Sequence, residues 1–141
     1  MSELGVSMAL ITDIARDITV EEGMWTGRHA AAAVGAGVDA FGLGGNEVGH
    51  PPEKHLAACD MARAAGLPSI PHAGETVGPE SIWGAIRHLG ARRIGHGVRC
   101  MEDPALVAYL RQTQLPLEVN PTSNICLKVS DRRGTRGPHA E

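Results

Sequence analysis

The feature that most constrains this chain is a regular alternation of short apolar runs with longer stretches of helical character. The apolar runs are too short for helices and predict β-strands at residues 7–12, 38–43, 67–71, 93–95 and 115–119. The stretches between them predict helices at residues 25–36, 52–65, 79–89 and 104–112. This order indicates a parallel sheet covered by helices.

Residues with functional potential recur near the ends of the predicted strands. Gly45, His72, His96 and Asn120 lie at or just beyond successive strand ends, at intervals of 27, 24 and 24 residues. A βα-barrel builds its active site at the carboxyl ends of consecutive strands, whereas a doubly wound sheet concentrates its site at one switch point. The pattern favours an α/β fold, an incomplete TIM-type (β/α)8 barrel with about five parallel strands and four helices.

Composition limits the function classes that remain. With 141 residues, 43% of them hydrophobic, we expect one domain or part of a larger one, with a barrel domain at residues 1–129 and a polar, disordered tail at 130–141. The net charge of −3 provides no basic surface for nucleic acid, and no apolar run is long enough to span a bilayer. The first five residues lack the features of a secretory signal, which predicts a cytoplasmic protein. Three separated cysteines without a C-x-x-C pattern predict neither a disulfide framework nor a thiolate zinc site.

The segment with the clearest chemical potential is His72-Ala73-Gly74-Glu75, which follows a short apolar run. A metal ligand beside a proton-transfer group is the simplest chemistry for such a pair. Taken alone, His72 could equally be a hydrogen-bonded core histidine, and Glu75 a carboxylate near a helix start. One unit later His96 lies between two glycines, which add no bulk beside its ring. Because parallel strand ends meet at one edge, we expect these three side chains to converge.

Two further segments lie at the same predicted edge. The glycine-rich stretch at residues 42–47 removes side chains where a strand meets its loop, either to let the backbone approach a flat ligand or to form a tight turn with positive φ. The stretch at residues 120–124 predicts a polar turn. No phosphate-binding glycine motif opens any predicted helix. The remaining histidines have no comparable setting and are interpreted as solvated or structural: His29, His50, His55, His88 and His139.

Together, four ordered segments resemble the central motifs of the adenosine deaminase family: residues 41–47 (FGLGGNE), 72–75 (HAGE), 94–97 (IGHG) followed by Glu102-Asp103, and 117–124 (LEVNPTSN). The resemblance extends from about residue 7 to residue 129. It implies a zinc-dependent (β/α)8 barrel that hydrolyses the exocyclic amine of a purine, converting adenosine to inosine and ammonia. The implied partner is a small purine nucleoside or base.

The resemblance also implies residue roles. His72 matches a zinc ligand, and Glu75 matches the acid/base that protonates the purine ring nitrogen. His96 matches the histidine that orients the attacking water, and Gly45 matches the glycine whose backbone amide contacts the base. The cofactor implied is one zinc ion, which lowers the pKa of bound water from ~9 to ~7.

The sequence departs from the family pattern in two places. The family's H-x-H pair after the first strand and its paired aspartates after the eighth have no counterpart, so the zinc shell is incomplete and the chain resembles a truncated form. Five strands cannot close a barrel built for eight, and we expect self-association through the open sheet edges.

Alternative functions remain open at this point. The substrate could be a related 6-aminopurine, adenine or aminofutalosine, or the chain could be a non-catalytic fragment. Schiff-base chemistry in an aldolase-like barrel ranks last because it needs a lysine at a strand end, and Lys54 and Lys128 fall in a predicted helix and a loop.

Overall fold

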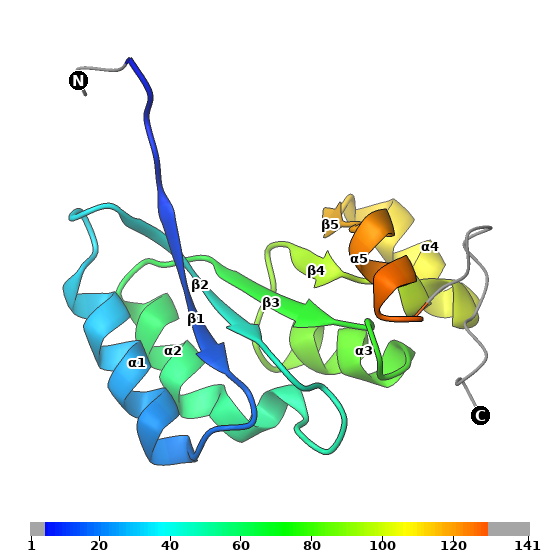
Figure 1. Cartoon of the computed structure of the whole chain (residues 1–141), viewed down its shortest axis with the longest axis horizontal. Coiled ribbons are helices and arrows are strands. Elements are labelled where there is room, and N and C mark those ends of the chain that lie inside the picture. The colour runs from blue at the N-terminus through cyan, green and yellow to red at the C-terminus, as the bar shows by residue number, and fades with distance from the viewer. Residues whose placement is uncertain (1–4, 130–141) are drawn as a thin grey trace.

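The computed structural model describes residues 5–129. Its centre is a sheet of five parallel strands arranged in sequence order, with helices between successive strands (Figure 1). The strands are β1 (Leu10–Ala15), β2 (Val38–Gly44), β3 (Ser69–Ala73), β4 (Ile94–His96) and β5 (Leu117–Glu118). This arrangement confirms the prediction of a parallel α/β fold that forms part of a barrel.

Five α-helices accompany the strands within residues 5–129, together with the short 3-10 turns η1 (Pro52–His55) and η2 (Val98–Glu102). The helices are α1 (Val20–Ala32), α2 (Leu56–Ala64), α3 (Pro79–Arg87), α4 (Pro104–Thr113) and α5 (Pro121–Cys126). Helices α1, α2 and α3 follow one another along one side of the sheet (Figure 1). As predicted, α3 and α4 open with proline, whose fixed φ suits the first helical turn.

Several predicted boundaries were wrong. The first strand begins at Leu10 and not at residue 7, and the last is reduced to two residues. Helix α1 begins five residues before the predicted start because Thr19 and Glu22 form a capping box, in which each side chain binds the other's backbone N–H. The polar turn predicted at residues 120–124 instead opens the short helix α5, with Pro121 in its first turn.

The core consists of two apolar clusters. One lies between the first two strands and helices α1 and α2, with Phe41 and Leu43 among its members, and the other lies around β3, β4, α3 and α4, with Ile82 and Ile94. Each cluster is formed by helices packed on the strands that they connect, as expected for strand–helix units. The sheet is left with two open edges, at β1 and at β5.

Two sequence predictions concern features away from the site. In the described part of the chain, no helix combines the length and the apolar character needed to cross a membrane. The three cysteines are free: Cys59 and Cys100 are buried and Cys126 is exposed. The tail predicted at residues 130–141 lies outside the described residues.

Candidate active site

His72, Glu75 and His96 converge at one end of the sheet. His72 is the penultimate residue of β3, His96 ends β4, and Glu75 lies in the turn that follows β3. One potential ligand atom from each residue lies within 4.8 Å of the other two. The parallel pairing of Ala73 with His96 brings the two strand ends level, as the spacing of the motifs predicted.

The three groups can exchange protons or share a metal ion. His96 Nε2 lies 3.5 Å from Glu75 Oε1, and the ring centroids of His72 and His96 are 5.0 Å apart in an edge-on arrangement. The His96 side chain is 7% exposed and that of Glu75 15%, so interactions between them are weakly screened by water. A carboxyl group and an imidazole at this distance are suited to general acid–base catalysis.

The glycines around His96 have definite steric roles. A Cβ at Gly95 would lie 2.9 Å from Cγ of the His72 ring, because Gly95 pairs with His72 across the sheet. His96 itself has φ of +63° and Gly97 has φ of +67°. A left-handed backbone is strained for histidine, and such strain is typical of functional positions.

Asn124 supports His96 from behind and was given no role in the sequence analysis. Its Oδ1 lies 2.9 Å from His96 Nδ1, and the Asn124 side chain is buried. With the amide oxygen at this position, Nδ1 donates the hydrogen bond, and the tautomer that does so has its lone pair on Nε2, the nitrogen that faces Glu75. The place of Asn124 in the LEVNPTSN segment was the one sequence feature that pointed to it. Its pairing with His96 could not be seen locally, because the two residues are 28 positions apart.

The glycine-rich segment combines a tight turn with close packing. Gly45, which follows β2, has φ of +84°, so the positive-φ interpretation of this segment holds. Gly42 is needed for another reason, because its missing side chain leaves room for the carboxylate of Asp13 on β1. Gly45 is exposed at the same strand-end edge, and its predicted contact with a purine stays a prediction.

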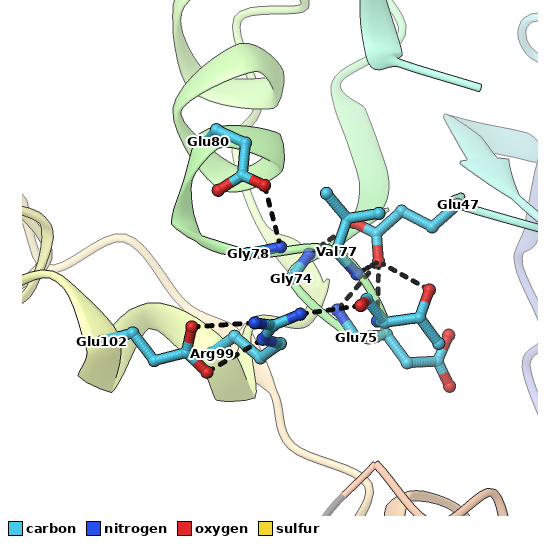
Figure 2. A network of polar contacts seen from close by, with 9 residues as sticks. Glu47, Gly74, Glu75, Val77, Gly78, Glu80, Arg99 and Glu102 are labelled. Carbon is cyan, nitrogen blue, oxygen red and sulfur yellow. Dashed lines mark hydrogen bonds and ion pairs between the residues drawn. The ribbon is translucent and has the colours of Figure 1, made fainter. Parts of the chain in front are cut away.

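Glu47, at the end of this segment, is a buried carboxylate in a dense polar network (Figure 2). It accepts hydrogen bonds from Gly74–Val77 and from Ser81. Burial by itself raises the pKa of this carboxyl, but the hydrogen bonds from Ser81 and from the backbone stabilise the charged form, and its pKa lies below the usual value.

The main chain of His72 is also held in place. The buried guanidinium of Arg16, just beyond β1, donates to the carbonyl oxygens of His50 and His72. The Arg16 carbonyl accepts in turn from Lys54 Nζ at 3.0 Å and lies 3.2 Å from His55 Nε2. These contacts tie β1, β3 and η1 together beneath the site.

The other histidines fit their interpretation as structural or solvated. His55 is buried against Arg16, His88 lies 3.2 Å from Glu53, and His29 bonds to the Trp25 carbonyl. His139 lies outside the described residues. Neither lysine of the aldolase alternative is at a strand end: Lys54 lies in η1 and Lys128 follows α5.

The donor set fits a zinc ion. An imidazole nitrogen such as that of His72 is a common zinc ligand. The potential ligand atom of His72 lies within 4.8 Å of those of Glu75 and His96, so a metal ion bound to His72 would lie close to both of these groups.

Several deaminases are similar to this chain in sequence. The sequence family described as adenosine deaminase matches residues 1–134. An aminodeoxyfutalosine deaminase from Streptomyces avermitilis is 52% identical over 93 residues, 66% of this chain and 26% of that protein. An adenine deaminase from Crocosphaera subtropica is 44% identical over 127 residues, 90% of this chain and 39% of that protein. The chain thus spans between 26% and 39% of these relatives' lengths.

Several solved structures are also similar to this chain. An adenine deaminase from Arthrobacter aurescens has a TM-score of 0.84 at 38% identity, and the matched region is 91% of this chain and 39% of the deaminase chain. An amidohydrolase from Burkholderia ambifaria, solved with bound zinc, has a TM-score of 0.81 at 28% identity, covering 86% and 34%. An Arabidopsis structure solved with IMP has a TM-score of 0.73 at 29% identity, covering 83% and 34%.

Proposed function

The chain belongs to the adenosine deaminase family, and on that premise we propose that it forms the part of a zinc-dependent 6-aminopurine deaminase that carries the proton-transfer residues. The observation that carries this proposal is the convergence of His72, Glu75 and His96 at the carboxyl ends of adjacent parallel strands. Because the chain spans 39% of the adenine deaminase of known structure, the reaction is assigned to a completed barrel.

In the proposed reaction, a 6-aminopurine and water give a 6-oxopurine and ammonia. Protonated Glu75 donates its proton to a purine ring nitrogen, which makes the amino-bearing carbon electrophilic. The water oxygen adds to that carbon while its proton passes to Glu75. The carbon–nitrogen bond then breaks, and the amine leaves as ammonia after taking that proton. The proton of the added hydroxyl passes to Glu75, which leaves the 6-oxopurine and restores the protonated carboxyl group. One carboxyl group can serve both transfers because it is restored at the end.

His96 and Gly45 have positioning roles in this proposal. The Nε2 of His96 orients the attacking water, and Asn124 holds the ring through Nδ1 at 2.9 Å. The backbone amide of Gly45, an exposed residue, contacts the purine from the neighbouring strand end. Its positive φ is a conformation that glycine adopts at no steric cost.

We assign His72 as a zinc ligand. Zinc, when bound, supplies Lewis-acid chemistry and makes hydroxide available near neutral pH. Catalytic zinc sites generally use three protein ligands, and the chain contains neither an H-x-H pair nor paired aspartates. We therefore infer that His72 provides one donor of a shell that other segments complete.

For the substrate, we propose adenine in preference to adenosine, which the sequence analysis had favoured. Several adenine deaminases are similar to this chain, and one of them matches 94% of it at 42% identity. The substrate of second choice is aminodeoxyfutalosine, since a deaminase for it has 52% identity over a shorter part of the chain.

A pair of hybrid enzymes would test this proposal. In one, this chain replaces the matching segment of the Arthrobacter adenine deaminase, and in the other that of the Streptomyces aminodeoxyfutalosine deaminase. We expect the first, here called the adenine hybrid, to release ammonia from adenine. We expect the second to turn over little aminodeoxyfutalosine. Activity of the second hybrid alone would favour aminodeoxyfutalosine, and inactivity of both folded, zinc-loaded hybrids would refute the proposal.

Substitutions in the adenine hybrid would test the residue roles. Glu75→Gln should retain zinc while kcat falls by ~10²–10⁴-fold, the usual contribution of general acid–base catalysis. His72→Ala should lose zinc as well as activity. If Glu75→Gln released the metal or left turnover unchanged, the proton-transfer role of Glu75 would be wrong.

A further inference from the structure

We propose that Glu47 is a positioning residue, whose carboxylate holds the turn after β3 and so fixes where the Glu75 carboxyl lies. The inference rests on the proposed function, because it assigns Glu47 a purpose only if Glu75 transfers protons. Glu47 touches neither of the two histidines in the contacts described above. It acts on the reaction through the backbone of the Glu75 turn.

The contacts of Glu47 converge on the residues around Glu75 (Figure 2). Oε1 accepts from the Gly74 N–H at 2.7 Å and from the Ser81 hydroxyl. Oε2 accepts from the backbone N–H groups of Glu75 at 3.1 Å, Thr76 at 2.8 Å and Val77 at 2.9 Å, and from the Thr76 hydroxyl at 3.3 Å. Four consecutive backbone amides, including that of Glu75 itself, therefore point at one carboxylate.

A second set of contacts holds the opposite side of the turn. Arg99 Nη1 donates to the Thr76 carbonyl at 2.7 Å, and the Arg99 guanidinium is held by two hydrogen bonds to Glu102 (Figure 2). The backbone N–H groups of Gly97 and Arg99 donate to the carbonyls of Ala73 and Gly74 at 3.0 and 3.1 Å. The turn thus has its amides bound on one side, and two of its carbonyls, together with that of Ala73 at the end of β3, bound on the other.

Capping of helix α3 does not explain this geometry. Helix α3 begins at Pro79, whereas the amides bound by Glu47 belong to residues 74–77, which precede it. The amide of Gly78, the N-cap residue of α3, donates to Glu80 Oε1 at 3.2 Å and not to Glu47. Glu47 instead joins the end of β2 to the turn after β3, the two adjacent strand ends that flank the site.

The charge of Glu47 is essential to the proposed role. A carboxylate only accepts hydrogen bonds, and each group bonded to the Glu47 carboxylate in the contacts above is a donor. Glutamine has the same shape, but its NH₂ group would meet N–H groups and leave buried donors without a partner, a change that costs more than losing one bond. Because the turn would have to shift to relieve this, the Glu75 carboxyl would move relative to His96.

Four variants of the adenine hybrid separate positioning from simple stabilisation. Glu47→Gln removes the charge at constant size, and Glu47→Asp keeps the charge with a shorter side chain. Ser81→Ala is the mild variant, because it removes one donor to Oε1 and leaves Glu47 intact. Glu80→Gln is the matched control, since this exposed glutamate binds the same turn only at Gly78.

For Glu47→Gln we expect kcat to fall by about 10²-fold, the loss typical of a 1 Å misplacement, with KM and zinc content near those of the parent. Glu47→Asp should recover part of kcat, Ser81→Ala should lower it less, and Glu80→Gln should not change it. Hydrogen exchange measured by peptide mass spectrometry should accelerate over residues 74–77 in Glu47→Gln and not in Glu80→Gln. Hydrogen exchange reports on the turn whether or not the hybrid deaminates adenine. An inactive parent hybrid would therefore refute the proposed function, while the exchange rates over residues 74–77 would still test whether Glu47 holds the turn.

The proposal is overturned if Glu47→Gln leaves exchange in the turn and kcat unchanged. It is also overturned if zinc content and activity fall only in proportion to the folded fraction, because Glu47 would then be structural only. Should Glu47→Gln fail to fold, the decision passes to Ser81→Ala and Glu47→Asp, where a fall in kcat at parental KM and zinc content supports positioning. Parental kcat in both folded variants refutes it.

Discussion

Gly95→Ala is the substitution with the most specific expected effect, because the added methyl group meets one side chain. Its Cβ would lie closest to Cδ2 of His72, with Cγ at 2.9 Å and Nε2 at 3.1 Å, whereas ordinary contact begins at 3.4 Å. The imidazole must therefore move by more than 0.5 Å, the difference between 3.4 and 2.9 Å, because Cδ2 is closer than Cγ. The backbone cannot absorb this shift easily, since β3 and β4 pair at this residue.

The magnitude follows from the sensitivity of catalysis to position. A 1 Å misplacement can cost ~10²-fold, so a shift of at least half that distance should lower kcat/KM by about 10–100-fold, or ~1.4–2.7 kcal/mol. Overpacking should also lower the free energy of unfolding by ~1–3 kcal/mol. Because His72 is the proposed zinc ligand, zinc occupancy should fall at limiting metal.

Gly44→Ala is the matched control, placed at the end of the neighbouring strand β2. Its Cβ would have its nearest neighbours, Asp13 Oδ2 and His72 Nδ1, at 3.8 and 3.9 Å, which is ordinary contact. Both variants would be made in the adenine hybrid and compared by ammonia release, elemental zinc analysis and thermal unfolding. Parental zinc occupancy and turnover in Gly95→Ala would refute the reasoning, as would equal losses in the two variants.

Four further predictions follow from single features of the structure. Asn124→Ala in the adenine hybrid should lower kcat about 10–100-fold with zinc retained, because the His96 ring loses its orienting acceptor; parental kcat would exclude this role. The pKa of Glu47 lies below its usual value, so the charged carboxylate stabilises the fold fully above pH ~4.3, and this stability is lost as the pH falls through the folded-state pKa. The difference in unfolding free energy between the parent and Glu47→Gln should therefore become smaller in acid. Chemical denaturation at several pH values would measure it. Burial raises the pKa of Cys59 to about 11, so a thiol reagent at pH 8 should modify exposed Cys126 quickly and Cys59 only on unfolding, which mass mapping would check. The 141-residue chain alone should self-associate through its open sheet edges, and a monodisperse monomer in sedimentation would contradict this.

Local patterns in the sequence were enough to predict the fold class and the convergence of three residues. The intervals of 24 residues between His72, His96 and Asn120 match one strand–helix unit each, and parallel strands necessarily bring their carboxyl ends to one edge. Periodicity therefore sufficed to predict that His72, Glu75 and His96 meet. Boundaries were less predictable where a local hydrogen bond decided them, as the capping box of Thr19 and Glu22 did for helix α1.

The sequence by itself determined the order of elements, the parallel sheet and the edge at which the site lies, because these depend on residue types a few positions apart. Only the tertiary structure decided which groups support the site. Glu47 reaches amides 27 to 30 positions away, and Asn124 reaches His96 across 28 positions. Nothing local distinguishes a buried, fully bonded glutamate from a solvated one, because its partners are backbone amides that every residue except proline has. Such partnerships exist only once the strands are packed in register.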